Sequence, residues 1–147
     1  MSTTYNSTPN TAYSSAEPST SAPLYSPMQI AMGTFLGGFA AGGFLLAGNY
    51  HRMARKGEAI AAAIGGVLAT LAMIGLAMTM PQTPGMLLGV VQTFAMLGIA
   101  KMTQGKQFQE HVEAGGEIAK GWKPVLVSLG TGAVVFLLIL VIALLSV

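Results

Sequence analysis

The chain has 147 residues, of which 52% are hydrophobic and only 8% are charged, and its formal net charge is +2. Soluble domains carry about 25% charged residues, so the composition excludes an ordinary soluble domain and indicates one compact membrane domain. The absence of cysteine excludes disulfides and thiolate metal sites, and the small net charge gives no reason to expect a nucleic-acid partner.

The first 26 residues are rich in Ser, Thr, Pro and Asn and carry a single charged residue, Glu17. They contain too few apolar side chains to form a core, so a disordered tail is predicted for residues 1–26. The tail lacks the basic start of a signal peptide, and the apolar sequence begins too late for one. Pro27 stands where a helix can begin.

Four apolar segments follow the tail, and each is long enough to be a membrane-spanning helix. They cover residues of about 28–50, 59–80, 86–102 and 125–147. The second and third are separated by a short turn around Pro81 and Pro84, so they must run antiparallel. The prediction is an all-α fold, an integral membrane four-helix bundle over residues 27–147 with a disordered N-terminal tail.

All seven basic residues lie in two short polar segments, 51–58 and 101–123. Four spans would place both segments on one side of the membrane, and the tail, the Pro turn and the C-terminus on the other. Basic loops of membrane proteins usually face the cytoplasm. The expected topology is therefore multi-pass, with both the N-terminus and the C-terminus outside.

Small residues recur in every span, and the first span alone contains six glycines. Glycine costs about 1 kcal/mol relative to alanine in a water-soluble helix, whereas in a membrane it lets helices approach closely. The predicted helix-packing residues are Gly33, Gly37, Gly38, Gly42, Gly65, Gly66, Gly89 and Gly132. Two interpretations stay open: packing within one bundle, and homo-oligomerisation through the first helix.

The 103–123 segment is polar, but its apolar residues recur at a regular spacing. Its apolar residues at helical spacing are Phe108, Val112, Ala119 and Trp122. This spacing predicts an amphipathic helix that lies on the cytoplasmic face of the membrane. A docking surface for a partner is the alternative.

Few polar side chains occur within the spans. Gln92 is the most polar of them; its expected role is an interhelical hydrogen bond, and lining a polar path is the alternative. Aromatic and basic side chains are typical anchors at membrane interfaces, and Tyr50, Arg52 and Trp122 occupy such positions. The absence of charged residues within the spans argues against proton relays and ion-coupled transport.

The sequence contains no catalytic or cofactor-binding pattern. It has no Asp, and no nucleophile stands near a base, so an enzyme is not expected and no cofactor is predicted. The carboxylates around His111 lack a second histidine at metal-ligand spacing, so no metal site is predicted there. Several methionines near one end of the predicted bundle leave a soft-metal site as a minor alternative.

The first span also carries a recognisable pattern of short motifs. Between Leu24 and Tyr50 the sequence reads LYSP, QIA, TFLGG, AGG and LLAGNY. It resembles the first span of a family of small bacterial membrane proteins that also have a Ser/Thr/Pro-rich leader and basic residues after this span. The resemblance implies a bacterial inner-membrane location and no mechanism. Phe39 stands where a proline would fit the pattern, which favours a straight helix.

These features predict a non-catalytic integral membrane protein, a structural or accessory subunit that packs with itself or with a larger membrane complex. The alternative is an oligomeric pore or transporter component for a small solute. The expected partners are the lipid bilayer and either further copies of the chain or another membrane protein, with no nucleic acid.

Overall fold

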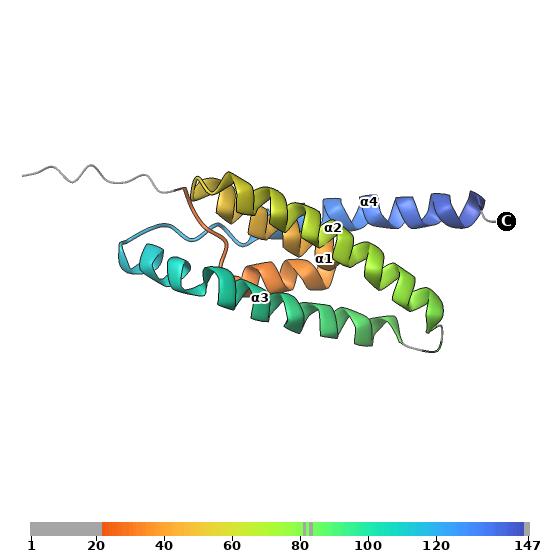
Figure 1. Cartoon of the computed structure of the whole chain (residues 1–147). Coiled ribbons are helices and arrows are strands. Elements are labelled where there is room, and N and C mark those ends of the chain that lie inside the picture. The colour runs from red at the N-terminus through yellow and green to blue at the C-terminus, as the bar shows by residue number, and fades with distance from the viewer. Residues whose placement is uncertain (1–21, 81, 83, 146–147) are drawn as a thin grey trace, which may run out of the picture.

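The computed structural model of the chain describes residues 22–80, 82 and 84–145. Its helices are α1 (Pro27–Arg52), α2 (Lys56–Thr79), α3 (Gly85–Glu113) and α4 (Trp122–Leu145), as Figure 1 shows. By total length and composition alone, each of the four would suffice to cross a membrane. The prediction of an all-α fold with four helices is confirmed, while residues 1–21 of the predicted tail lie outside the described residues.

α1 does not run straight. Its chain reverses at Gly38, whose φ of 72° and ψ of −173° are not helical. The backbone N–H of Tyr25 donates to Oδ1 of Asn49 at 2.7 Å, although a straight helix would separate residues 24 positions apart by about 36 Å. Residues 27–37 and 39–52 therefore form two antiparallel half-helices, called the hairpin below (Figure 1). The single straight span predicted over residues 28–50 is corrected to this hairpin.

The reversal follows from the local sequence. A positive φ with an extended ψ is accessible to glycine at Gly38 and strained for any residue with a Cβ atom. Other small residues let the two half-helices lie close together: Gly33 faces the side chain of Leu45, and Gly42 faces the hydroxyl of Thr34. Because the break contains neither proline nor charge, the apolar run across it looks continuous.

The hairpin is the core of the protein. Each of α2, α3 and α4 packs against α1, whereas these three helices make almost no contact with one another among the described residues. Ile30, Leu45 and Ala100 are fully buried at this core, while most large apolar side chains of the outer helices are exposed. Long apolar helices on the outside suit a bilayer and would be unfavourable in water.

Both ends of the hairpin lie at the end of the bundle that carries the basic residues, called the basic end and made of residues 22–26, 51–58 and 101–123. The N–H of Leu24 donates to the carbonyl of Glu117 at 3.1 Å, and the N–H of Ala119 donates to the carbonyl of Leu24 at 2.8 Å. The end of α2, the start of α3 and the end of α4 lie at the opposite end, called the distal end (Figure 1). Residues 22–26 thus lie with the basic segments and not, as predicted, opposite to them.

α3 is longer than the sequence pattern predicts. The helix continues past the expected boundary at Met102 and ends at Glu113. The separate amphipathic helix predicted within 103–123 is therefore corrected, because only residues 114–121 lie between helices. Gly105 does not end α3, since a single glycine weakens a helix by only about 1 kcal/mol.

The hairpin makes a prediction for chemical labelling. Because the chain has no cysteine, single cysteines can be placed at the exposed positions Ala22, Gln82 and Gly121. In oriented membrane vesicles, a membrane-impermeant thiol reagent is expected to label Ala22→Cys and Gly121→Cys from one side and Gln82→Cys from the other. A straight α1 would instead make Ala22→Cys react from the same side as Gln82→Cys.

Two adjacent glycines of α2 allow a matched test of the packing on α1. A Cβ atom at Gly66 would lie 2.8 Å from Cα of Gly43, whereas a Cβ atom at Gly65 would have no atom within 4 Å. Gly66→Ala is expected to lower the free energy of unfolding by about 1–3 kcal/mol, the usual cost of overpacking, and Gly65→Ala to cause no loss. Thermal unfolding in detergent, followed by circular dichroism, measures both; equal effects would contradict this contact.

Candidate functional site

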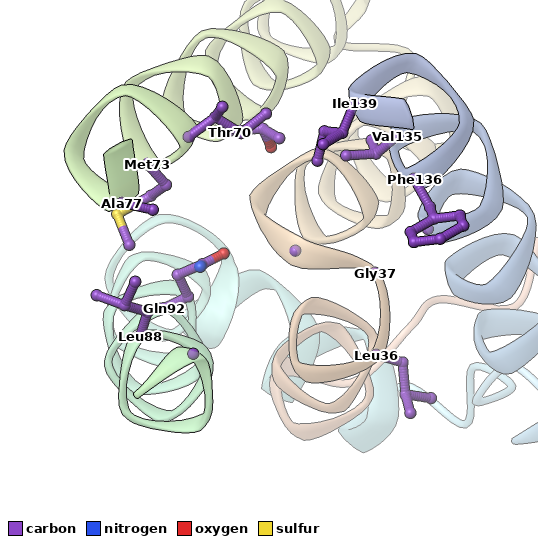
Figure 2. A pocket seen from close by; sticks show the side chains of 14 residues that line it. Leu36, Gly37, Thr70, Met73, Ala77, Leu88, Gln92, Val135, Phe136 and Ile139 are labelled. Atoms are coloured by element: carbon purple, nitrogen blue, oxygen red, sulfur yellow. The ribbon is translucent and has the colours of Figure 1, made fainter. Parts of the chain in front are cut away.

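The tip of the hairpin lies among α2, α3 and α4 (Figure 2). The first N–H groups of its second half-helix have no carbonyl partner within that half-helix. One of them, the N–H of Ala40, donates to Oγ1 of Thr70 in α2 at 2.8 Å, and this hydroxyl donates in turn to the carbonyl of Gly66 at 2.9 Å. A side chain from another helix thus caps the break in α1.

A cavity of about 340 Å³, called the tip cavity, adjoins this break. Apolar side chains form most of its wall, among them Met73 of α2, Leu88 of α3 and Phe136 of α4 (Figure 2). None of the described residues that line it is ionisable. Small-molecule sites usually have volumes of about 300–1,000 Å³, so the tip cavity has the size for a small uncharged ligand.

Gln92 supplies the side-chain amide in the wall of the tip cavity. Figure 2 shows this amide directed toward the hairpin, and its Oε1 lies 3.6 Å from the position of a Cβ atom on Gly38. The side-chain hydrogen bonds described nearby involve Thr70 and Thr93, and none involves Gln92, so the interhelical hydrogen bond predicted for it is not found there. An amide without a partner costs roughly 2–7 kcal/mol in an apolar environment. The half-buried amide of Gln92 can therefore take water or a solute in the tip cavity as its polar partner.

Besides Gly38 at the reversal, three of the predicted packing glycines lie inside the hairpin. A Cβ atom at Gly33 would lie 2.7 Å from Oγ of Ser128 in α4, and one at Gly37 would lie 2.7 Å from Cβ of Ala41. A Cβ atom at Gly42 would meet both Thr34 and the side chain of Met96 in α3. The absence of a side chain at these positions lets the two half-helices and their neighbours approach one another.

The other predicted glycines differ from one another. Gly66 touches the hairpin, and a Cβ atom at Gly132 would lie 3.3 Å from the carbonyl oxygen of Leu36, so both serve the contacts with α1. A Cβ atom at Gly89 would touch one aromatic carbon at 4.0 Å, and one at Gly65 would touch no atom. The structure therefore brings most of these glycines to α1 and leaves Gly65 on a free surface.

Sequence reasoning missed a buried polar cluster at the basic end. The amide of Asn49 donates to the carbonyl of Tyr25 at 2.8 Å and to Oε1 of Gln104 at 2.9 Å, and it accepts the N–H of Tyr25. Gln104 donates in turn to the carbonyl of Leu46 at 3.2 Å. Asn49 and Gln104 are almost fully buried. Their presence near segment ends was visible in the sequence, but their pairing follows only from the reversal of α1.

The three predicted interface anchors have different surroundings. Tyr50 is buried in the core, and Trp122 is 58% exposed at the start of α4. Arg52 donates to the carbonyl of Pro23 and to the hydroxyl of Tyr25 at 3.3 Å, and its guanidinium lies 4.5 Å from the centre of the Tyr25 ring. Arg52 thus holds the segment before α1 against the end of the same helix.

The site offers binding groups and no evident reactive group. Within the described residues, no cluster of three or more His, Asp or Glu side chains could hold a metal ion. Comparisons with protein-family models, with curated proteins and with solved structures give no match. The described wall of the tip cavity holds one side-chain amide and no side chain suited to acid–base work.

Proposed function

We propose that the protein is a non-catalytic subunit of a bacterial inner membrane that assembles with further copies of itself or with another membrane protein. The open packing of the outer helices carries this proposal. In the most apolar windows of α2, α3 and α4, only 6%, 11% and 11% of the residues are buried, against 61% in α1. The outer helices therefore keep most of their apolar surface for lipid or for other proteins.

Exposed glycines on these surfaces support association in addition to lipid contact. Cβ atoms at Gly65, Gly75 and Gly130 would have no atom within 4 Å, so these glycines serve no close packing among the described residues. In a membrane, small residues permit a close approach of another helix and its van der Waals contacts. A helix of a second protein can therefore make closer van der Waals contacts at these positions than lipid chains can.

The distribution of charge supports one orientation in the membrane. The basic end carries all Lys and Arg residues of the chain, and basic segments near membrane spans favour the cytoplasm. We therefore place the basic end, with residues 22–26, in the cytoplasm and the distal end outside. The resemblance of the first span to small bacterial membrane proteins supports the inner membrane as the location.

Association is tested by native mass spectrometry of protein extracted gently from its own membranes. A defined homo-oligomer or a stable complex with another membrane protein is expected, and a strictly monomeric, partner-free chain would contradict the proposal. Gly65→Leu with Gly75→Leu is expected to weaken the complex, because bulky side chains block close approach. Gly121→Leu, which lies in an exposed loop, is the control and should leave the complex intact.

The tip cavity supports a second candidate function, a pore or transporter component for a small uncharged solute. The observation that favours it is the half-buried amide of Gln92, which lines the tip cavity and is directed toward the hairpin. If this path exists, Gln92→Leu should abolish the flux of glycerol or urea into proteoliposomes, and Gln92→Asn should retain part of it. Unchanged flux in the correctly folded Gln92→Leu protein would exclude a role of this amide in transport.

A further inference from the structure

A second cavity lies at the basic end, away from the hairpin tip. It has a volume of about 560 Å³ and is called the basic cavity. The residues that line it are Pro23, Glu117, Ile118, Lys120, Trp122 and Lys123. They come from the segment before α1, from the loop between α3 and α4 and from the start of α4.

Backbone hydrogen bonds hold the wall of the basic cavity in place. Leu24 and the loop exchange two of them, from the N–H of Leu24 to the carbonyl of Glu117 and from the N–H of Ala119 to the carbonyl of Leu24. The side-chain amide of Gln29 donates to the carbonyl of Ala119 at 2.9 Å. Leu24 and Ala119 are both buried. The backbone before Lys120 and Lys123 is therefore held in a fixed position.

The basic cavity carries an excess of positive charge. Lys120 and Lys123 line it, and the guanidinium of Arg52 donates to the carbonyl of Pro23 at its edge. Among the described residues of its wall, Glu117 alone is acidic. The ion pairs found within the described residues lie elsewhere, so neither lysine has a carboxylate partner there. An anionic group would satisfy both ammonium groups through charge-assisted hydrogen bonds.

Exposed apolar side chains adjoin these charges. Ile118 and Trp122 are 50% and 58% exposed in the wall of the basic cavity, and Leu126, one turn further along α4, is 58% exposed. The part of α4 that could span a membrane begins at Trp122, and tryptophan is enriched where hydrocarbon meets the headgroups. The basic cavity therefore lies at the level of lipid headgroups, and the apolar face of α4 extends from it into the membrane.

We propose that the basic cavity binds the headgroup of an anionic phospholipid, whose acyl chains lie along α4. A lipid matches both halves of the site, because its phosphate meets the lysines and its chains cover the exposed side chains of α4. Basic pockets beside membrane helices on the cytoplasmic side recognise anionic headgroups in this way. The proposal does not depend on the association of the chain or on the tip cavity.

The test compares lipid retention in nanodiscs that contain phosphatidylglycerol and phosphatidylcholine, read out by native mass spectrometry. The wild-type chain should retain phosphatidylglycerol in preference to phosphatidylcholine. The double variant Lys120→Gln/Lys123→Gln should lower the affinity by at least about tenfold for each lysine, because each loses a charge-assisted hydrogen bond to the phosphate, worth about 1.5 kcal/mol or more. The matched control, Lys56→Gln/Lys106→Gln, removes the same charge elsewhere at the basic end and should leave retention nearly unchanged.

Three results would overturn the proposal. Equal losses in the two double variants would show general charge attraction without a site. Equal retention of both lipids by the wild-type chain would show that the headgroup charge is not recognised. Displacement of phosphatidylglycerol by inorganic phosphate would show a site for a free anion. The substituted lysines lie outside the hairpin core, so the circular dichroism spectrum of each variant should match that of the wild type.

Discussion

The structure depends on one constraint, which is that the reversal of α1 at Gly38 must be covered by other helices. A break in a helix leaves backbone N–H and C=O groups without partners, and hydrocarbon offers them no water. Thr70 satisfies one of these groups, and α2, α3 and α4 pack around the hairpin. This constraint explains why three long helices pack on one glycine-rich element and make so little contact with one another.

The same reversal shapes the basic end. Because both ends of the hairpin emerge together, Tyr25 meets Asn49, and the segment before α1 pairs with the loop that follows α3. The resulting surface combines the basic segments with a piece of chain that a straight first span would have carried to the distal end. The wall of the basic cavity is therefore a product of the hairpin, since Pro23 could not otherwise lie beside Lys120.

Composition and hydropathy were enough to predict the four helices, the antiparallel directions of α2 and α3 and the clustering of basic residues in two segments. They did not predict the reversal, because Gly38 is one of six glycines in an apolar run and a broken helix has the same hydropathy as a continuous one. The burial of Asn49 and Gln104 and the position of the tip cavity follow from that reversal. Neither this burial nor the tip cavity could therefore be predicted from the sequence. Gln92 was singled out only because it is the most polar side chain within a span.

The tip cavity and the free outer helices are two consequences of this open packing. In Figure 1 the hairpin reaches only part of the way along the bundle, and beyond it α4 separates from α2 and α3 toward the distal end. Acyl chains in this region would leave the amide of Gln92 without a hydrogen-bond partner, which is unfavourable in hydrocarbon. The polarity of Gln92 therefore suits a hydrated tip cavity better than one filled by acyl chains.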